Sequence, residues 1–170
     1  MIGLLVGRFQ PFHNGHLKAI EWAMKKCSRL IILVGSSQKC YELENPFTVG
    51  ERIEMIQRVL EKRGMNNCML LSVPDIQNNA LWVAHVNSLV PRYDVVFTNN
   101  PLAKRLFKDS GKKVIEFPMM DRLENEGTKI RKSMLKDNKW QSLVPEEVKT
   151  FVLEIKSIER LKEIINKDIV

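Results

Sequence analysis

The sequence predicts a doubly wound α/β fold, in which helices cover both faces of a five-stranded parallel sheet. Five short apolar runs have the character of strands, and segments with helical spacing of apolar residues lie between them. Because neighbouring parallel strands need crossover connections, this alternation favours a parallel sheet. Only helical patterns follow residue 128, which indicates extra helices at the C-terminal end.

The first strand and helix have the clearest signals. The apolar run 2–6 ends at Gly7, which is typical of a buried parallel strand. Apolar residues then recur from Leu17 to Cys27 at helical spacing, so a helix is expected over 14–28. The second strand is expected at 30–34, where Gly35 ends the apolar run.

Later elements follow from caps and apolar runs. Thr48 and Glu51 have the spacing of a capping box, so Thr48 is expected to begin the second helix, which Gly64 ends. Pro145 fits the first turn of its helix. Three strands are expected at 69–73, 95–98 and 113–117, and helices at about 79–89, 102–110, 128–137, 145–155 and 158–166. Ligands of such Rossmann-like sheets bind beyond the carboxyl ends of the strands.

Size and composition set broad limits. A chain of 170 residues with 44% hydrophobic content fits one domain over 1–170, with a helical part from about 128. The formal charge of +7 suits an anionic partner, but no arginine-rich or aromatic-plus-basic tract predicts a nucleic acid. No leader-like start or long apolar run is present, so a cytoplasmic protein without a membrane partner is expected.

The three cysteines do not predict a metal site or a disulfide framework. Cys27, Cys40 and Cys68 are far apart and lack Cys-x-x-Cys spacing. Cys27 and Cys68 lie in apolar contexts and are expected to be buried, inert thiols.

The richest candidate site is the segment 7–16, Gly-Arg-Phe-Gln-Pro-Phe-His-Asn-Gly-His, directly after the first strand. His13 and His16 bracket Gly15 at a helix start, where free N–H groups and the helix dipole attract phosphate. Two imidazoles can donate to phosphoryl oxygens, and Arg8 adds a planar donor fork. The strand, glycine and helix context disfavours a plain surface pair or half of a metal site. The two familiar glycine-loop motifs for nucleotides are absent.

This segment resembles the His-x-Gly-His signature of the nucleotidyltransferase α/β superfamily, and its long form is similar to that of archaeal-type nicotinamide-nucleotide adenylyltransferases. The resemblance implies an enzyme of NAD biosynthesis that joins the AMP moiety of ATP to nicotinamide mononucleotide (NMN), giving NAD and pyrophosphate. It also implies Mg²⁺ or another divalent cation on the phosphates, without protein ligands, and a homo-oligomer. Matching blocks continue in the family's order at 35–38, 44–52, 75–83, 100–102 and 127–131.

The resemblance also implies roles for individual residues. Asn79 suits a carboxamide, which needs a donor and an acceptor, and the Trp82 ring suits stacking on nicotinamide. Taken alone, Trp82 would be a core residue and Arg131 a solvated helix charge. The catalytic residues would be His13, His16 and Arg131; the ATP site would add Gly7, Arg8, Phe9, Gly15 and Thr128, and the pyridine nucleotide site Ser36, Asp75, Asn79 and Trp82.

Some positions depart from the family's pattern or have no clear role in it. Glu126 replaces the serine before Thr-x-Ile-Arg, and Met120 lies where the family places an aromatic ring. Arg52 is expected either to contact the nucleotide or to lie on the surface, and His85 to be structural or exposed. The alternatives that stay open are another acceptor (phosphopantetheine, a flavin nucleotide or nicotinate mononucleotide), a non-catalytic nucleotide-binding regulator, and an RNA-binding protein.

Overall fold

The computed structural model describes residues 1–118 and 127–167, and the chain divides into two compact units. The single domain expected over 1–170 stays a prediction. The first unit comprises Met1–Arg8, Lys18–Ser37 and Asn67–Met119, and the second comprises Phe9–Leu17, Gln38–Asn66 and Met120–Val170.

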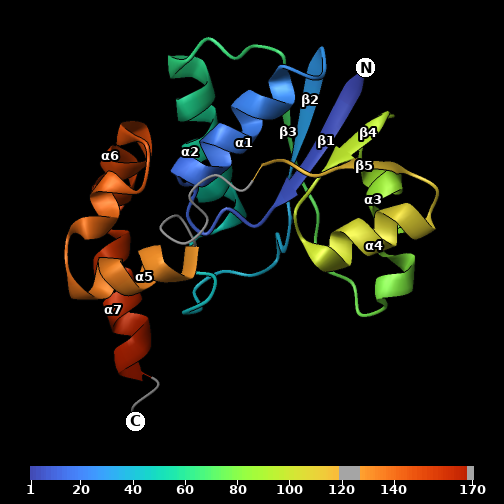
Figure 1. Ribbon diagram of the computed structural model, residues 1–170. Coiled ribbons are helices and arrows are strands. Elements are labelled where there is room, and N and C mark those ends of the chain that lie inside the picture. The colour runs from blue at the N-terminus through green and yellow to red at the C-terminus, as the bar shows by residue number, and fades with distance from the viewer. Residues whose placement is uncertain (119–126, 168–170) are drawn as a thin grey trace. The chain divides into compact units, whose positions relative to one another are not determined.

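The first unit contains a five-stranded parallel sheet in the order β3-β2-β1-β4-β5 (Figure 1). The expected α/β class and all five strands are confirmed, with ends shifted by one or two residues. The strand order reverses between β1 and β4, which is where ligands of such sheets bind. The strands are β1 (Ile2–Gly7), β2 (Arg29–Val34), β3 (Cys68–Ser72), β4 (Val95–Phe97) and β5 (Lys113–Ile115).

One face of this sheet packs against helices α3 (Trp82–Leu89) and α4 (Pro101–Asp109). Leu4, Ile31 and Val96 of the sheet share a buried cluster with Val86 of α3 and Phe107 of α4. Each such side chain contributes about 1.5–3 kcal/mol when it leaves water. These contacts fix the loops that lead from the strands into the helices. A 3-10 turn, η1 (Asn79–Leu81), precedes α3.

Helix α1 (Asn14–Met24) covers the opposite face, since Trp22 meets the ring of Phe97, the neighbour of Val96 on its strand. The helix ends four residues before the expected residue 28. The N–H groups of Lys25 and Lys26 bond carbonyls three residues back, which closes the helix in a tight turn.

Gly3 of β1 leaves room for this packing, and its replacement gives a stability prediction. A Cβ at Gly3 would lie 2.5 Å from Cε2 of Phe97, which is fully buried. We expect Gly3→Ala to lower the free energy of unfolding by about 1–3 kcal/mol through overpacking. Gly50→Ala is the matched control, because its nearest atom would be 3.9 Å away and alanine favours the helix. Urea unfolding measures both, and an unchanged Gly3→Ala midpoint would contradict the packing.

The second unit is helical, as expected for the C-terminal part. The capping box is confirmed: the Thr48 N–H donates to Oε2 of Glu51 at 2.9 Å, and the Glu51 N–H donates to Oγ1 of Thr48 at 3.2 Å. Pro145 directly precedes helix α6 (Glu146–Glu154). The sequence did not predict the short turn η2 (Lys139–Ser142), which contains the fully buried Trp140. The elements are α2 (Val49–Lys62), α5 (Gly127–Lys136), η2 (Lys139–Ser142), α6 (Glu146–Glu154) and α7 (Ser157–Lys167).

Two further expectations concern the cysteines and the membrane. Cys27 and Cys68 are partly exposed, so the expectation that they are buried is wrong. Their environment still raises both thiol pKa values, that of Cys68 to about 11, chiefly by desolvation, which keeps both sulfurs protonated. Over the described residues, the longest helices lack the length and apolar content that a membrane crossing requires.

Candidate functional site

His13 and His16 of the second unit form a stacked pair with ring centroids 3.6 Å apart. Nδ1 of His16 accepts a hydrogen bond from the His13 N–H at 3.2 Å, and Nδ1 of His13 accepts one from the His16 N–H at 3.3 Å. Phe9 and Phe12 lie against the His16 ring, with centroids 4.7 Å and 5.6 Å from it. Because each Nδ1 is an acceptor, the proton of each neutral ring lies on Nε2.

The surroundings keep both rings neutral. Burial lowers the pKa of His13 to about 3. Burial, reinforced by the neighbouring His13, lowers the pKa of His16 well below its ordinary 6.5. At neutral pH the pair therefore presents two Nε2–H donors and no net charge. Such donors suit an oxygen on which negative charge increases during a reaction.

The low pKa values predict that the protein loses stability in acid. Unfolding restores an ordinary pKa of 6.5, so below this pH the unfolded chain binds protons that the folded chain excludes. The free energy of unfolding should fall as pH drops: the His13 ring alone accounts for about 2 kcal/mol between about pH 7.5 and about pH 5, and the His16 ring adds to the fall. Urea unfolding at the two pH values measures the fall.

A double variant, His13→Gln with His16→Gln, isolates the contribution of the two rings. Over the same pH interval, we expect the free energy of unfolding of the double variant to fall less than that of the wild type, since glutamine does not titrate. Equal losses in both proteins would contradict the assignment of two neutral rings with lowered pKa values.

Arg131 of α5 is almost completely buried and holds the segment that carries the histidines. Its Nη1 donates to the carbonyl of Gln10 at 2.7 Å, and its Nη2 lies 3.2 Å from both a Glu44 carboxylate oxygen and the Thr128 hydroxyl. Arg131 is therefore hydrogen-bonded to the segment that carries the histidines, since Gln10 is three residues before His13. Gln10 and Glu44 had no assigned role, because these contacts join segments far apart in the sequence.

Arg52 of α2 is also buried, with 0% of its surface exposed. Its Nε donates to the Thr48 carbonyl at 3.3 Å. The alternative that placed Arg52 on the surface is therefore wrong. A residue in the first turn of a helix gives no sign in the sequence of what will cover it.

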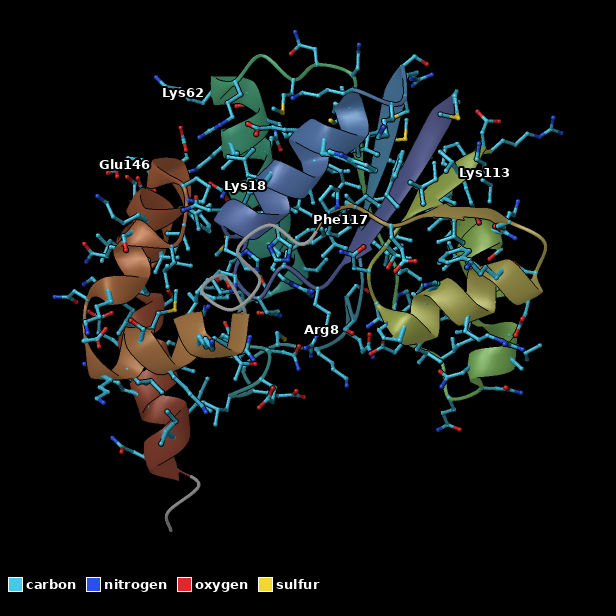
Figure 2. All side chains as sticks on the ribbon, in the orientation of Figure 1. Arg8, Lys18, Lys62, Lys113, Phe117 and Glu146 are labelled. Atoms are coloured by element: carbon cyan, nitrogen blue, oxygen red, sulfur yellow. The ribbon has the colours of Figure 1, made fainter. Side chains whose placement is uncertain are left out.

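The first unit contains a cavity of about 420 Å³ beyond the carboxyl ends of β1 to β4. Figure 2 shows Arg8 past this end of β1, whereas Lys113 begins β5 at the opposite end of the sheet. Six expected site residues line the cavity: Gly7, Arg8, Ser36, Asp75, Asn79 and Trp82. Further lining residues include Asn100 and Leu102, which belong to the matching block 100–102, and Ala103 and Leu106, which the sequence did not single out.

The cavity is lined by both polar and apolar side chains. The hydroxyl of Ser36, which is buried, donates to Oδ1 of Asp75 at 3.0 Å. The half-buried ring of Trp82 is held edge-on by Phe107 of α4, with centroids 5.4 Å apart. Trp82, Ala103 and Leu106 thus add apolar groups to a lining that also contains hydrogen-bonding groups, which suits a small aromatic ring bearing a polar substituent.

His85, Gly15 and Phe9 do not line the cavity. Nε2 of His85 lies 3.2 Å from the Pro74 carbonyl, which fits the expected structural role. Gly15 lies in the first turn of α1, and Phe9 packs on His16. Glu126 and Met120, where the sequence departs from the family's pattern, lie outside the described residues.

The chain is similar to known proteins in both sequence and structure. Residues 4–151 match the family model described as cytidylyltransferase-like. The chain is 46% identical to the nicotinamide-nucleotide adenylyltransferase of Archaeoglobus fulgidus over 173 residues, covering 99% of both chains. It is 44% identical over 168 residues to the enzyme of the same name from Saccharolobus solfataricus, covering 98% of both.

A solved structure shares the fold. It is a bifunctional NMN adenylyltransferase/ADP ribose pyrophosphatase from Francisella tularensis, complexed with AMP and a manganese ion, with a TM-score of 0.77 and 18% sequence identity. The match covers 98% of this chain and 52% of that one, so this chain spans about half the length of the bifunctional protein.

Proposed function

The chain belongs to the nicotinamide-nucleotide adenylyltransferases of the cytidylyltransferase-like family, and from this premise we propose which residues carry out the reaction. The enzyme joins the AMP moiety of ATP to NMN, giving NAD and pyrophosphate. The 5′-phosphate of NMN attacks the α-phosphorus of ATP, and the bond from that phosphorus to pyrophosphate breaks. No protein nucleophile is needed, so catalysis depends on positioning and on stabilising charge.

The stacked histidines are the observation that carries this assignment. Each Nδ1 accepts a main-chain N–H, so the Nε2–H groups of His13 and His16 are the donors that remain for ATP. We assign them to the phosphate oxygens that gain charge as pyrophosphate leaves. Neutral rings do not exchange protons with the substrate, so their hydrogen bonds strengthen with the charge and are not used up as acids.

Two arginines supply the permanent positive charge. Nη1 of Arg131 is held by the Gln10 carbonyl, while Nη2 lies between the Thr128 hydroxyl and the exposed carboxylate of Glu44. We assign Nη2 and the Thr128 hydroxyl to the ATP phosphates. Arg8 lines the cavity of the first unit and immediately precedes Phe9 in the chain, so we assign it to the phosphates as well.

The cavity of the first unit is the site that we propose for NMN. The Asn79 amide offers both the donor and the acceptor that a carboxamide requires. The Asp75 carboxylate, which already accepts from Ser36, is an acceptor for the same ligand. Trp82 provides the ring for nicotinamide, and the apolar side chains of Ala103 and Leu106 complete that wall.

We propose that a divalent cation such as Mg²⁺ is held by the phosphates of ATP. Imidazole N–H and guanidinium groups suit phosphate oxygens, whereas Mg²⁺ prefers oxygen ligands and keeps several waters. In residues 1–118 and 127–167, no three His, Cys, Asp or Glu side chains gather closely enough to hold a metal ion. The bound ion would neutralise charge on the triphosphate.

The expected homo-oligomer stays a prediction, and sedimentation velocity would test it.

A panel of acceptors tests the assignment of the substrate. The protein is incubated with ATP, Mg²⁺ and one of NMN, nicotinate mononucleotide, a flavin mononucleotide or pantetheine phosphate, and pyrophosphate and product are measured. We expect the largest kcat/KM with NMN. Turnover with only a flavin or pantetheine phosphate would contradict the pyridine assignment, and ATP binding without pyrophosphate from any acceptor would indicate a nucleotide-binding regulator.

A further inference from the structure

Gln10 is a buried polar residue that the reaction as described does not use. Its side chain is 3% exposed, and its amide group forms two hydrogen bonds with the main chain of Phe47. Nε2 donates to the Phe47 carbonyl at 2.9 Å, and Oε1 accepts from the Phe47 N–H at 3.0 Å. The amide thus pairs with Phe47 as a neighbouring strand would. A planar group with both a donor and an acceptor is required for this pairing.

The main chain of Gln10 makes the contact that matters for the site. Its carbonyl accepts from Nη1 of Arg131 at 2.7 Å. Gly127, at the start of α5, allows this approach, since a Cβ there would lie 3.0 Å from Nη1 of Arg131 and 3.1 Å from the Gln10 oxygen. One residue therefore joins the histidine segment, the segment before α2 and the arginine of α5.

We infer that Gln10 is a positioning residue for adenylyl transfer, and that it acts through Arg131. Pairing with Phe47 fixes the Gln10 peptide, and the fixed carbonyl sets the direction of the Arg131 guanidinium. Nη1 is occupied by that carbonyl, so Nη2 is the end directed at Thr128 and, under the proposed function on which this inference rests, at the phosphates. Gln10 itself need not touch a substrate.

The first test replaces the amide while retaining side-chain length. Gln10→Met keeps an apolar chain of similar volume but loses both hydrogen bonds, and Gln10→Glu keeps the acceptor but loses the donor. Displacing a reacting group by about 1 Å costs about 100-fold in rate, so kcat for both variants should fall by roughly this factor. The KM for NMN should stay within about threefold, because the proposed NMN cavity belongs to the first unit.

Gln57→Met is the matched control. The Gln57 side chain is exposed on α2, and among the described residues it forms a side-chain hydrogen bond with Glu61 alone. The kcat of the Gln57→Met variant should therefore equal that of the wild type. Near-UV circular dichroism and thermal unfolding follow the fold of each variant. A folded Gln10→Met enzyme with wild-type kcat would overturn the inference, and so would loss of the fold in both Gln10 variants, since Gln10 would then be a folding residue.

A double-mutant cycle tests whether Gln10 acts through Arg131. In an Arg131→Met background, Gln10→Met should lower kcat by less than about threefold, because the group that it positions is already absent. A further loss of about 100-fold, as in the wild-type background, would make the two effects independent and overturn the inference. Wild-type protein in the same assay separates the two claims: if it forms no NAD the proposed function fails, whereas an active wild type with independent effects refutes only the role of Gln10.

Discussion

Replacing His16 with alanine should lower kcat by about 100- to 1,000-fold while weakening ATP binding by less than about tenfold. The reason is the geometry of the histidine pair. Nδ1 of His16 is occupied by the His13 N–H, so its Nε2–H is the group that meets the developing charge. A donor that strengthens its bond only as charge builds contributes more to the transition state than to the bound substrate. Steady-state kinetics and ATP titration measure the two quantities separately.

The third histidine of the chain provides the control. His85→Ala removes a ring that meets the Pro74 carbonyl, so kcat should change by less than about threefold. His16→Gln should recover part of the lost rate, because its amide can still donate. If His16→Ala strongly weakened ATP binding and left kcat unchanged, the histidine would bind substrate and transition state equally, and the proposed role would be wrong.

Replacing Trp82 with alanine should raise the KM for NMN by about 10- to 100-fold and leave ATP binding unchanged. Stacking of a base on an aromatic side chain contributes about 1–3 kcal/mol, which corresponds to this range. Trp82 lines the cavity of the first unit, and Phe107 fixes the angle of its ring. Initial rates at varied NMN and saturating ATP measure the change.

Trp82→Phe is the conservative control and should keep the KM for NMN within about fivefold of the wild-type value, since a ring remains. Trp22→Ala removes an indole that lies outside the cavity, against Phe97, and should affect stability more than KM. An unchanged KM in Trp82→Ala would mean that the indole belongs to the core alone.

Much of the fold followed from local patterns in the sequence. The five strands are short apolar runs, and the capping box of Thr48 and Glu51 depends on residues three apart. The end of α1 was missed because the closing turn at Lys25 and Lys26 has no glycine or proline to signal it. The turn η2 was missed because it depends on burial of Trp140, which is a tertiary contact.

The candidate site divides in the same way. Residues soon after strands could be anticipated, because the carboxyl ends of parallel strands lie along one edge, and Arg8, Ser36 and Asp75 do line one cavity. The burial of Arg52 could not be anticipated from the sequence. Nor could the hydrogen bond from Arg131 to Gln10, since it joins residues 121 positions apart. Ala103 and Leu106 look like ordinary helix residues in the sequence.

The fate of the ATP phosphates tests adenylyl transfer most directly. The protein is given NMN and Mg²⁺ with ATP labelled either at the α-phosphorus or at the γ-phosphorus, and the products are separated. The proposed reaction places the α-label in NAD and the γ-label in pyrophosphate. Recovery of the γ-label in the acceptor, or of the α-label only in ATP, would contradict the account.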